Sequence, residues 1–115
     1  GMSIAELVRL ARDRWPARTV HVECDRREQV VEAVDAGADA LLLDNMTPDE
    51  VRACVELVDG RCLVEASGGI ELDTVADYAA TGVDLLSVGR ITNSAPVLDI
   101  GLDITPDDVV DRQVL

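Results

Sequence analysis

Residues 39–67, DALLLDNMTPDEVRACVELVDGRCLVEAS, decide the fold because they read as strand, helix and strand in direct succession. Residues 39–44 and 62–67 are short runs rich in apolar side chains, whereas 47–60 carries apolar residues at helical spacing. That helix opens on a capping pattern, TPDE, and closes on a glycine, as helices commonly do. The stretch therefore predicts two parallel strands joined by a helical crossover.

The same alternation extends in both directions along the chain. A repeat supports it, since Gly37-Ala38-Asp39 and Gly82-Val83-Asp84 precede two of the expected strands at an offset of 45 residues, which fits two strand–helix units. The further predicted elements are a helix over 3–14, a strand over 19–24, a helix over 27–37, a helix over 71–82, a strand over 84–89 and an extra strand over 97–104.

Four parallel strands with intervening helices predict an α/β fold that forms half of a TIM-like (β/α) barrel. A flavodoxin-like open sheet is the alternative, because the element order alone fits both. In either fold, chemistry gathers at the carboxyl ends of the strands. The predicted domain spans 3–104, and residues 105–115 read as an acidic tail.

Composition narrows the classes of function. The chain has 115 residues and a formal net charge of −13, and its basic side chains are all arginine. Such a charge repels nucleic acid and anionic lipid, and one tryptophan and one tyrosine offer no platform for stacking bases. Three cysteines without CxxC spacing indicate reduced thiols in the cytoplasm.

Three carboxylates stand near the expected strand ends at equal spacing. Glu23, Asp44 and Glu65 are each 21 residues apart and fall on the more polar face of their strands. Acids here often cap the next helix, and Asp25 is predicted to do so. Asp44 is not needed as a cap because Thr47 already supplies one. We therefore expect Glu23, Asp44 and Glu65 to converge as functional groups.

Two glycine-containing turns complete the candidate site. Ser67-Gly68-Gly69 follows one strand and precedes a predicted helix, where backbone N–H groups can approach a phosphate. Gly89-Arg90 ends the next strand, and paired glycine turns on neighbouring strands bind phosphate in many (β/α) barrels. The pattern predicts a phosphate site without naming the ester. We expect Gly68→Val to block backbone approach to the phosphate without greatly disturbing the strands.

Four segments resemble, in order and spacing, the C-terminal part of the quinolinate phosphoribosyltransferase family. That family, also called nicotinate-nucleotide pyrophosphorylase (carboxylating), converts quinolinate and phosphoribosyl pyrophosphate to nicotinate mononucleotide, CO₂ and pyrophosphate with Mg²⁺ in NAD biosynthesis. The resemblance covers roughly residues 4 to 104. The segments are VHVECD, ALLLDNMTPDEV, LVEASGGIELDTVADYAATGVDLLSVG and ITNSAPVLDIGLDI.

The resemblance implies roles for individual residues. Glu23 and Asp44 match the family's catalytic acids, which contact the ribose and the side of the metal-bound pyrophosphate; Asp44 is thus the implied contact to Mg²⁺. Asn93 stands where the family usually has histidine, and Arg90 is expected to compensate for the lost charge. Ser67, Gly68 and Gly89 match the family's phosphate-binding positions. Together with the groups identified from the strand ends, the predicted phosphate- and ribose-binding set is Glu65, Ser67, Gly68, Gly69, Gly89, Arg90 and Asn93.

The family's cationic residues that grip quinolinate have no counterpart in this sequence. We therefore expect a fragment that is inactive alone and binds phosphoribosyl pyrophosphate or phosphate, with quinolinate bound only beside the missing half. Two other interpretations stay open: an independent phosphate-binding (β/α) domain from another phosphosugar barrel, and a non-catalytic, self-associating scaffold. Exposed strand edges beside apolar surface predict a homodimer.

Overall fold

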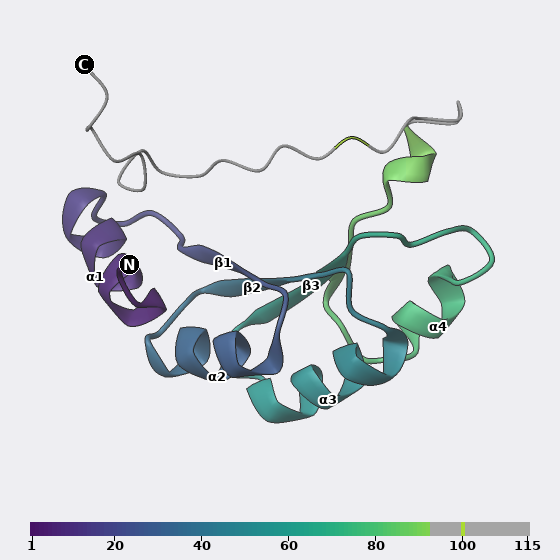
Figure 1. Ribbon diagram of the computed structural model, residues 1–115, viewed down its shortest axis with the longest axis horizontal. Coiled ribbons are helices and arrows are strands. Elements are labelled where there is room, and N and C mark those ends of the chain that lie inside the picture. Colours follow the sequence, from purple (N-terminus) through teal and green to yellow (C-terminus); the bar gives the residue numbers. More distant parts are fainter. Residues whose placement is uncertain (93–99, 101–115) are drawn as a thin grey trace, which may run out of the picture.

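The protein is described by a computed structural model that covers residues 1–92 and 100 (Figure 1). Its sheet has four parallel strands, β1 (His21–Cys24), β2 (Ala40–Asp44), β3 (Leu63–Ser67) and β4 (Leu85–Leu86). Each strand pairs with the next one along the chain, in the order β1-β2-β3-β4. A flavodoxin-like sheet would place its first strand between the second and third. The order is that of a (β/α) barrel arc, so the open-sheet alternative is wrong.

Helices cover the sheet on one side. The helices are α1 (Ile4–Arg14), α2 (Arg27–Asp35), α3 (Pro48–Val58) and α4 (Val75–Ala79). In Figure 1, α2, α3 and α4 lie beneath the strands and α1 flanks β1. An open doubly wound sheet carries helices on both faces, whereas a barrel carries them only outside. The face on which residues 1–92 and 100 place no α-helix is therefore the one that would line a barrel interior.

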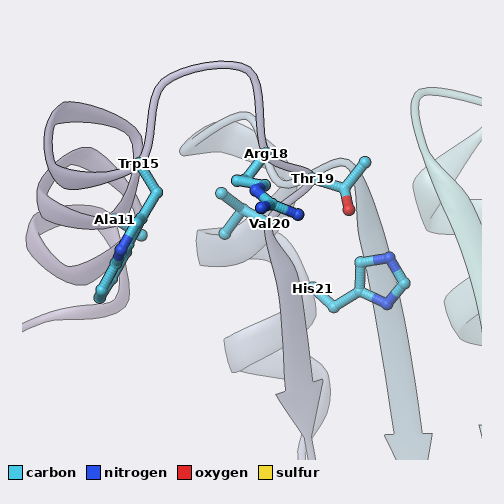
Figure 2. A pocket seen from close by; sticks show the side chains of 6 residues that line it. All are labelled: Ala11, Trp15, Arg18, Thr19, Val20 and His21. Carbon is cyan, nitrogen blue, oxygen red and sulfur yellow. The ribbon is translucent and has the colours of Figure 1, made fainter.

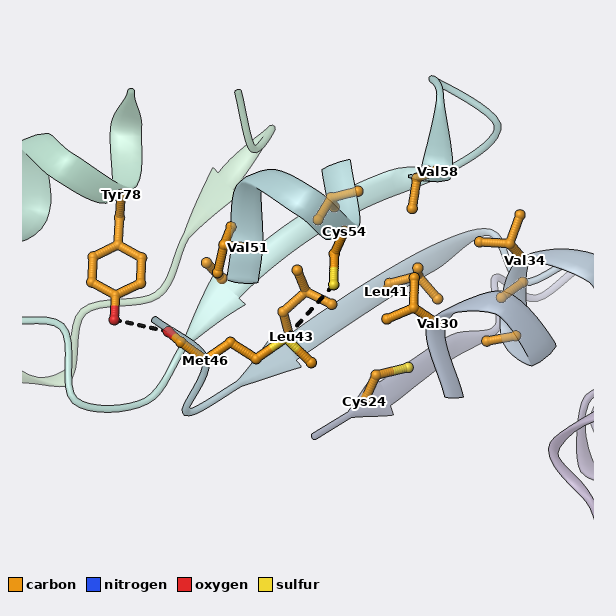
Figure 3. Packing of buried hydrophobic residues seen from close by; sticks show 14 of the residues in the cluster. Cys24, Val30, Val34, Leu41, Leu43, Met46, Val51, Cys54, Val58 and Tyr78 are labelled. Carbon is orange, nitrogen blue, oxygen red and sulfur yellow. Dashed lines mark hydrogen bonds between the residues drawn. The ribbon is translucent and has the colours of Figure 1, made fainter. Parts of the chain in front are cut away.

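The core lies between the sheet and these helices. The helix-facing side chains of the strands alternate with those on the open face, and Leu41 and Leu43 of β2 are fully buried. They pack with Val30 of α2 and Val51 of α3 (Figure 3). Burial of an aliphatic side chain of this size contributes roughly 1.5–3 kcal/mol. The apolar face of the strands therefore lies beneath the helices, opposite the more polar face predicted for the acids.

Of the two helix caps predicted, the one at Thr47 is formed and the one at Asp25 is not. The Ser3–Glu6 and Thr47–Glu50 boxes are both formed. Asp25 does not cap α2, because the side chain of Gln29 accepts from the backbone N–H groups of Asp25 and Arg26 at 2.8 and 3.2 Å. Arg26 becomes the N-cap position instead. The helix consequently starts one residue later than a cap at Asp25 would set it.

The last two elements are shorter than predicted. The helix expected over 71–82 is confined to 75–79, since the hydroxyl of Thr74 accepts from the backbone N–H of Glu71 and holds that segment in a turn. Strand β4 stops at Leu86, and the chain continues into a 3₁₀ turn, η1 (Gly89–Ile91). No helix of the described residues is long and apolar enough to cross a membrane.

Some sequence-based predictions lie outside the described residues. Asn93 and the acidic tail over 105–115 are among them, as is all of the predicted strand 97–104 except Ile100. The described residues do not test these predictions.

Candidate functional site at the carboxyl ends of the strands

The open face of the sheet carries the three predicted carboxylates. Strand register places Glu23, Leu42 and Glu65 in one row, and Asp44 beside Ser67 in the row nearer the carboxyl ends. Neighbouring parallel strands lie about 4.8 Å apart, so Glu23 and Glu65 are separated by about 10 Å across the sheet. Asp44 lies on the strand between them, two residues closer to the carboxyl end of the sheet. The three acids share a face, as predicted.

The equal spacing of the acids along the chain does not align them in one row. The pairing offset is 19 residues between β1 and β2 and 23 between β2 and β3. A constant step of 21 residues therefore places Asp44 two residues beyond the row of Glu23 and Glu65. The result is a triangle of carboxylates, which no count of residues along the chain could have shown.

Each acid has a different local environment. Asp44 accepts a hydrogen bond from the side-chain amide of Asn45 at 2.6 Å. Glu65 accepts one from the hydroxyl of Ser87. Within the described residues, Glu23 has no hydrogen-bond or ion-pair partner. None of the three accepts a backbone N–H there, so their oxygens can accept from the hydroxyls of a ligand.

A hollow of about 390 Å³ opens at the ends of β3 and β4. Asp44 pairs in register with Ser67 and Glu65 accepts from Ser87, two residues of its wall, but none of the three acids itself lines the hollow. The hollow brings together five of the predicted residues: Ser67, Gly68, Gly69, Gly89 and Arg90. Its wall also contains Ile70, Glu71 and Ser87, which were not predicted as site residues. Ser87 could have been found from its place on the polar face. Glu71 gave no such signal, because it comes near Arg90 only through the turns at 71–74 and 89–91.

The cation of this hollow is paired with an acid. The Nε atom of Arg90 lies 2.9 Å from a carboxylate oxygen of Glu71, and both side chains are about half exposed. Arg90 belongs to η1 and does not directly follow a strand end as predicted. Its positive charge is thus partly offset. Phosphate recognition here would rest on backbone N–H groups more than on net charge.

Gly68 is required by packing within the protein. Its φ angle is +84°, and a Cβ atom built on it would lie 2.3 Å from Oδ1 and 2.7 Å from the backbone nitrogen of Asn45. The expectation that Gly68→Val leaves the strands undisturbed is therefore wrong. Nor does the loop lie directly at a helix terminus, since α4 begins only at Val75. Gly69 has a φ of +61° and open space around it.

A resident metal ion is not favoured by the protein groups alone. In residues 1–92 and 100, no group of three or more His, Cys, Asp or Glu side chains could hold one. Mg²⁺ commonly binds through one or two carboxylates, waters and the phosphates of a substrate. The carboxylate of Asp44, beside the hollow, fits an Mg²⁺ ion that is held partly by the phosphates of a substrate.

The other reactive groups lie at the amino end of the sheet or on its helix-facing side, in the core. A second hollow, of about 460 Å³, lies at the amino end of β1 and is lined by Ala11, Trp15, Arg18, Thr19, Val20 and His21 (Figure 2). His21 is exposed there. Burial raises the pKa of the Cys24 thiol to about 11, which keeps it protonated and unreactive. Cys24, Cys54 and Cys62 are all free thiols.

Comparison with known proteins gives a consistent result. Residues 2–103 match the family model described as quinolinate phosphoribosyl transferase, C-terminal domain. A probable nicotinate-nucleotide pyrophosphorylase [carboxylating] of Methanothermobacter thermautotrophicus is 43% identical over 108 residues, which cover 89% of this chain and 39% of that protein. The human nicotinate-nucleotide pyrophosphorylase [carboxylating] is 38% identical over 93 residues, covering 78% of this chain and 31% of its own length.

A solved structure agrees with the sequence relatives. The nicotinate-nucleotide pyrophosphorylase of Ehrlichia chaffeensis superposes with a TM-score of 0.76 at 38% identity, covering 89% of this chain and 37% of that one. The chain therefore spans less than two fifths of the length of each of these relatives. With the family model matching nearly the whole sequence, the chain belongs to the quinolinate phosphoribosyl transferase C-terminal domain family.

Proposed function

We propose that the chain carries the ribose- and phosphate-binding half-site of a quinolinate phosphoribosyltransferase. In that reaction quinolinate and phosphoribosyl pyrophosphate give nicotinate mononucleotide, CO₂ and pyrophosphate, a step of NAD biosynthesis. The observation that supports this proposal most strongly is the hollow between Ser67–Glu71 and Ser87–Arg90, at the end of the sheet that carries the acids of the open face. Family membership favours this function over that of another phosphosugar barrel.

Each part of the site is assigned a role in this proposal. The backbone N–H groups of Gly68, Gly69 and Gly89, with the hydroxyl of Ser67, would bind the 5′-phosphate of the ribose. Glu23 and Asp44 would accept hydrogen bonds from the ribose hydroxyls. Fixed acceptors of this kind position the sugar for attack at its anomeric carbon.

Asp44 would also face Mg²⁺ bound to the pyrophosphate of the substrate. When bound, the ion would neutralise negative charge on the leaving group. Asp44 is the nearest of the three acids to the carboxyl ends of the strands, which supports this assignment. Glu65 accepts from the hydroxyl of Ser87, a residue of the hollow's wall, and this supports a role for Glu65 in contacting the ribose.

Charge supports an inactive chain when it is assayed alone. Quinolinate carries two carboxylates and phosphoribosyl pyrophosphate several further negative charges, while this chain has a net charge of −13. The one arginine in the hollow is already paired with Glu71. We expect no measurable turnover from the purified chain. Turnover that disappears in Asp44→Ala would contradict this.

Binding of ribose 5-phosphate tests the half-site itself. Isothermal titration should detect weak binding that Asp44→Asn reduces about tenfold, because a charge-assisted hydrogen bond to a ribose hydroxyl is lost. Asp73→Asn removes the same charge from an exposed position outside the hollow and serves as the matched control. Equal affinities for the two variants would overturn the assignment of Asp44.

We also propose a homodimer in the cytoplasm. Strand β1 stands at one edge of the sheet, and Leu85 of β4 and Trp15 beside β1 are at least half exposed. Pairing of two copies would cover such surface. The three free thiols support the location. Analytical ultracentrifugation should find a dimer at micromolar concentration, and a compact monomer would contradict the assembly.

A further inference from the structure

The turn that follows β2 is fixed to its neighbours at consecutive residues. The backbone N–H of Asn45 donates to the carbonyl of Ser67 at 3.0 Å, which ties the turn to the end of β3. The hydroxyl of Tyr78, from α4, donates to the carbonyl of Met46 at 2.9 Å (Figure 3). Thr47 then caps α3. The backbone of this turn is therefore set by three different elements.

The side chain of Asn45 lies between two parts of the proposed site. Its Nδ2 donates to Oδ2 of Asp44 at 2.6 Å. Its Oδ1 occupies the space where Gly68 would carry a side chain, 2.3 Å from that hypothetical Cβ. One amide group thus contacts the carboxylate assigned to the ribose and the loop assigned to the phosphate.

The backbone of Asn45 explains why this residue type suits the position. Its φ angle is +56°, in the left-handed region, where asparagine is tolerated better than most residues with a side chain. The amide also offers a donor to Asp44 and an acceptor oxygen in one group. Aspartate would tolerate the same backbone, but it would set a second carboxylate against Asp44.

We propose that Asn45 is a positioning residue, which orients the carboxylate of Asp44 and fixes the Ser67–Gly69 loop so that both address one phosphoribosyl ligand. This inference rests on the proposed function. It also gives a reason within the protein for a glycine at 68, since the missing side chain makes room for Asn45. Asn45 itself need not touch the ligand.

A cycle of variants tests the link to Asp44. Asn45→Gly keeps a residue suited to a positive φ and removes only the side chain. We expect it to weaken ribose 5-phosphate binding about tenfold in the unmutated chain, and by no more than about threefold in an Asp44→Ala background. Asn45→Asp should weaken binding in the same way. An equal fold loss in both backgrounds would overturn the proposal, because a general structural effect acts alike in each.

A second measurement needs no ligand and tests the link to the loop. Gly68→Ala should lower the melting temperature less in an Asn45→Gly background than in the presence of Asn45, since part of the collision is then removed. The same loss in both backgrounds would overturn this half of the proposal. Failure of the unmutated chain to bind ribose 5-phosphate would instead overturn the proposed function, and with it the role of Asn45 toward a ligand.

Discussion

Acidic side chains have different roles at the two ends of this sheet. At the amino ends, Asp39 and Asp84 each exchange hydrogen bonds with the preceding strand. The Oδ2 atom of Asp39 accepts from the backbone N–H of Val20 at 2.7 Å, and that of Asp84 accepts from Val64 at 2.8 Å. The backbone N–H groups of the two aspartates donate back to the same two residues, at 2.9 Å each.

At the carboxyl ends, the described residues give Glu23, Asp44 and Glu65 no backbone N–H to accept. Asp44 and Glu65 accept only from side chains, Asn45 and Ser87. A carboxylate that satisfies a backbone donor stabilises the fold, whereas one held by side chains at a strand end can meet a ligand. The comparison therefore teaches that the partner of an acid, more than its place in a pattern, separates structural from functional carboxylates.

The largest expected effect is on stability at the amino ends. Asp84→Ala should lower the free energy of unfolding by about 1–2 kcal/mol, because the backbone N–H of Val64 loses a charged acceptor. Asp44→Ala should change it by no more than about 0.5 kcal/mol. Urea unfolding followed by circular dichroism measures both. Equal losses of unfolding free energy in the two variants would contradict the distinction between structural and functional carboxylates.

The dependence of stability on pH gives a second, smaller test at the same end. The hydrogen bond from the backbone of Val20, and then that from Arg12, lower the pKa of Asp39 below its usual value. A lowered folded-state pKa stabilises the fold above the unfolded pKa of about 3.9, and this contribution is lost as the pH falls through the folded value.

The stability difference between the unmutated chain and Asp39→Asn should therefore be constant from pH 7 to about 5 and shrink below about pH 4. Thermal or urea unfolding over this range measures the difference. Asp73→Asn is the matched control, and its difference from the unmutated chain should not show this loss. Parallel stability curves for Asp39→Asn and the unmutated chain would show that Asp39 does not act through its charge.

The smallest effect concerns the carboxyl ends, where a carboxylate should affect binding and not folding. Glu71 pairs with Arg90 and places a negative charge at the hollow. Glu71→Gln should strengthen binding of inorganic phosphate about two- to threefold, since an exposed ion pair competes only weakly. Asp73→Asn should leave that affinity unchanged. Weaker binding in Glu71→Gln would mean that the ion pair holds Arg90 in a useful position.

Much of the fold could be predicted from the sequence because its signals are local. The apolar run at the start of residues 39–67 forms β2 and the capping box at Thr47–Glu50 starts α3, both as expected. Two predictions failed where a nearby side chain competed for the backbone groups at the start of a helix. The side chain of Gln29 displaced Asp25 from the cap of α2, and the hydroxyl of Thr74 held residues 71–74 in a turn.

The candidate site could be predicted as a set of residues but not as an arrangement. Ser67, Gly68 and Arg90 do line one hollow. The contact between Asn45 and Gly68 joins residues 23 positions apart, and the pairing of Arg90 with Glu71 depends on two turns. Strand register, which sets Asp44 ahead of Glu23, is likewise a property of the assembled sheet.

Amide NMR on the labelled chain, titrated with ribose 5-phosphate, tests the central claim most directly, because it observes both ends of the sheet at once. The account predicts shifts in 67–71 and 87–91, at the hollow beside the carboxyl ends, and none in the second hollow around Trp15 and His21. Shifts confined to residues 11–21, with the 67–71 amides unchanged, would contradict the account.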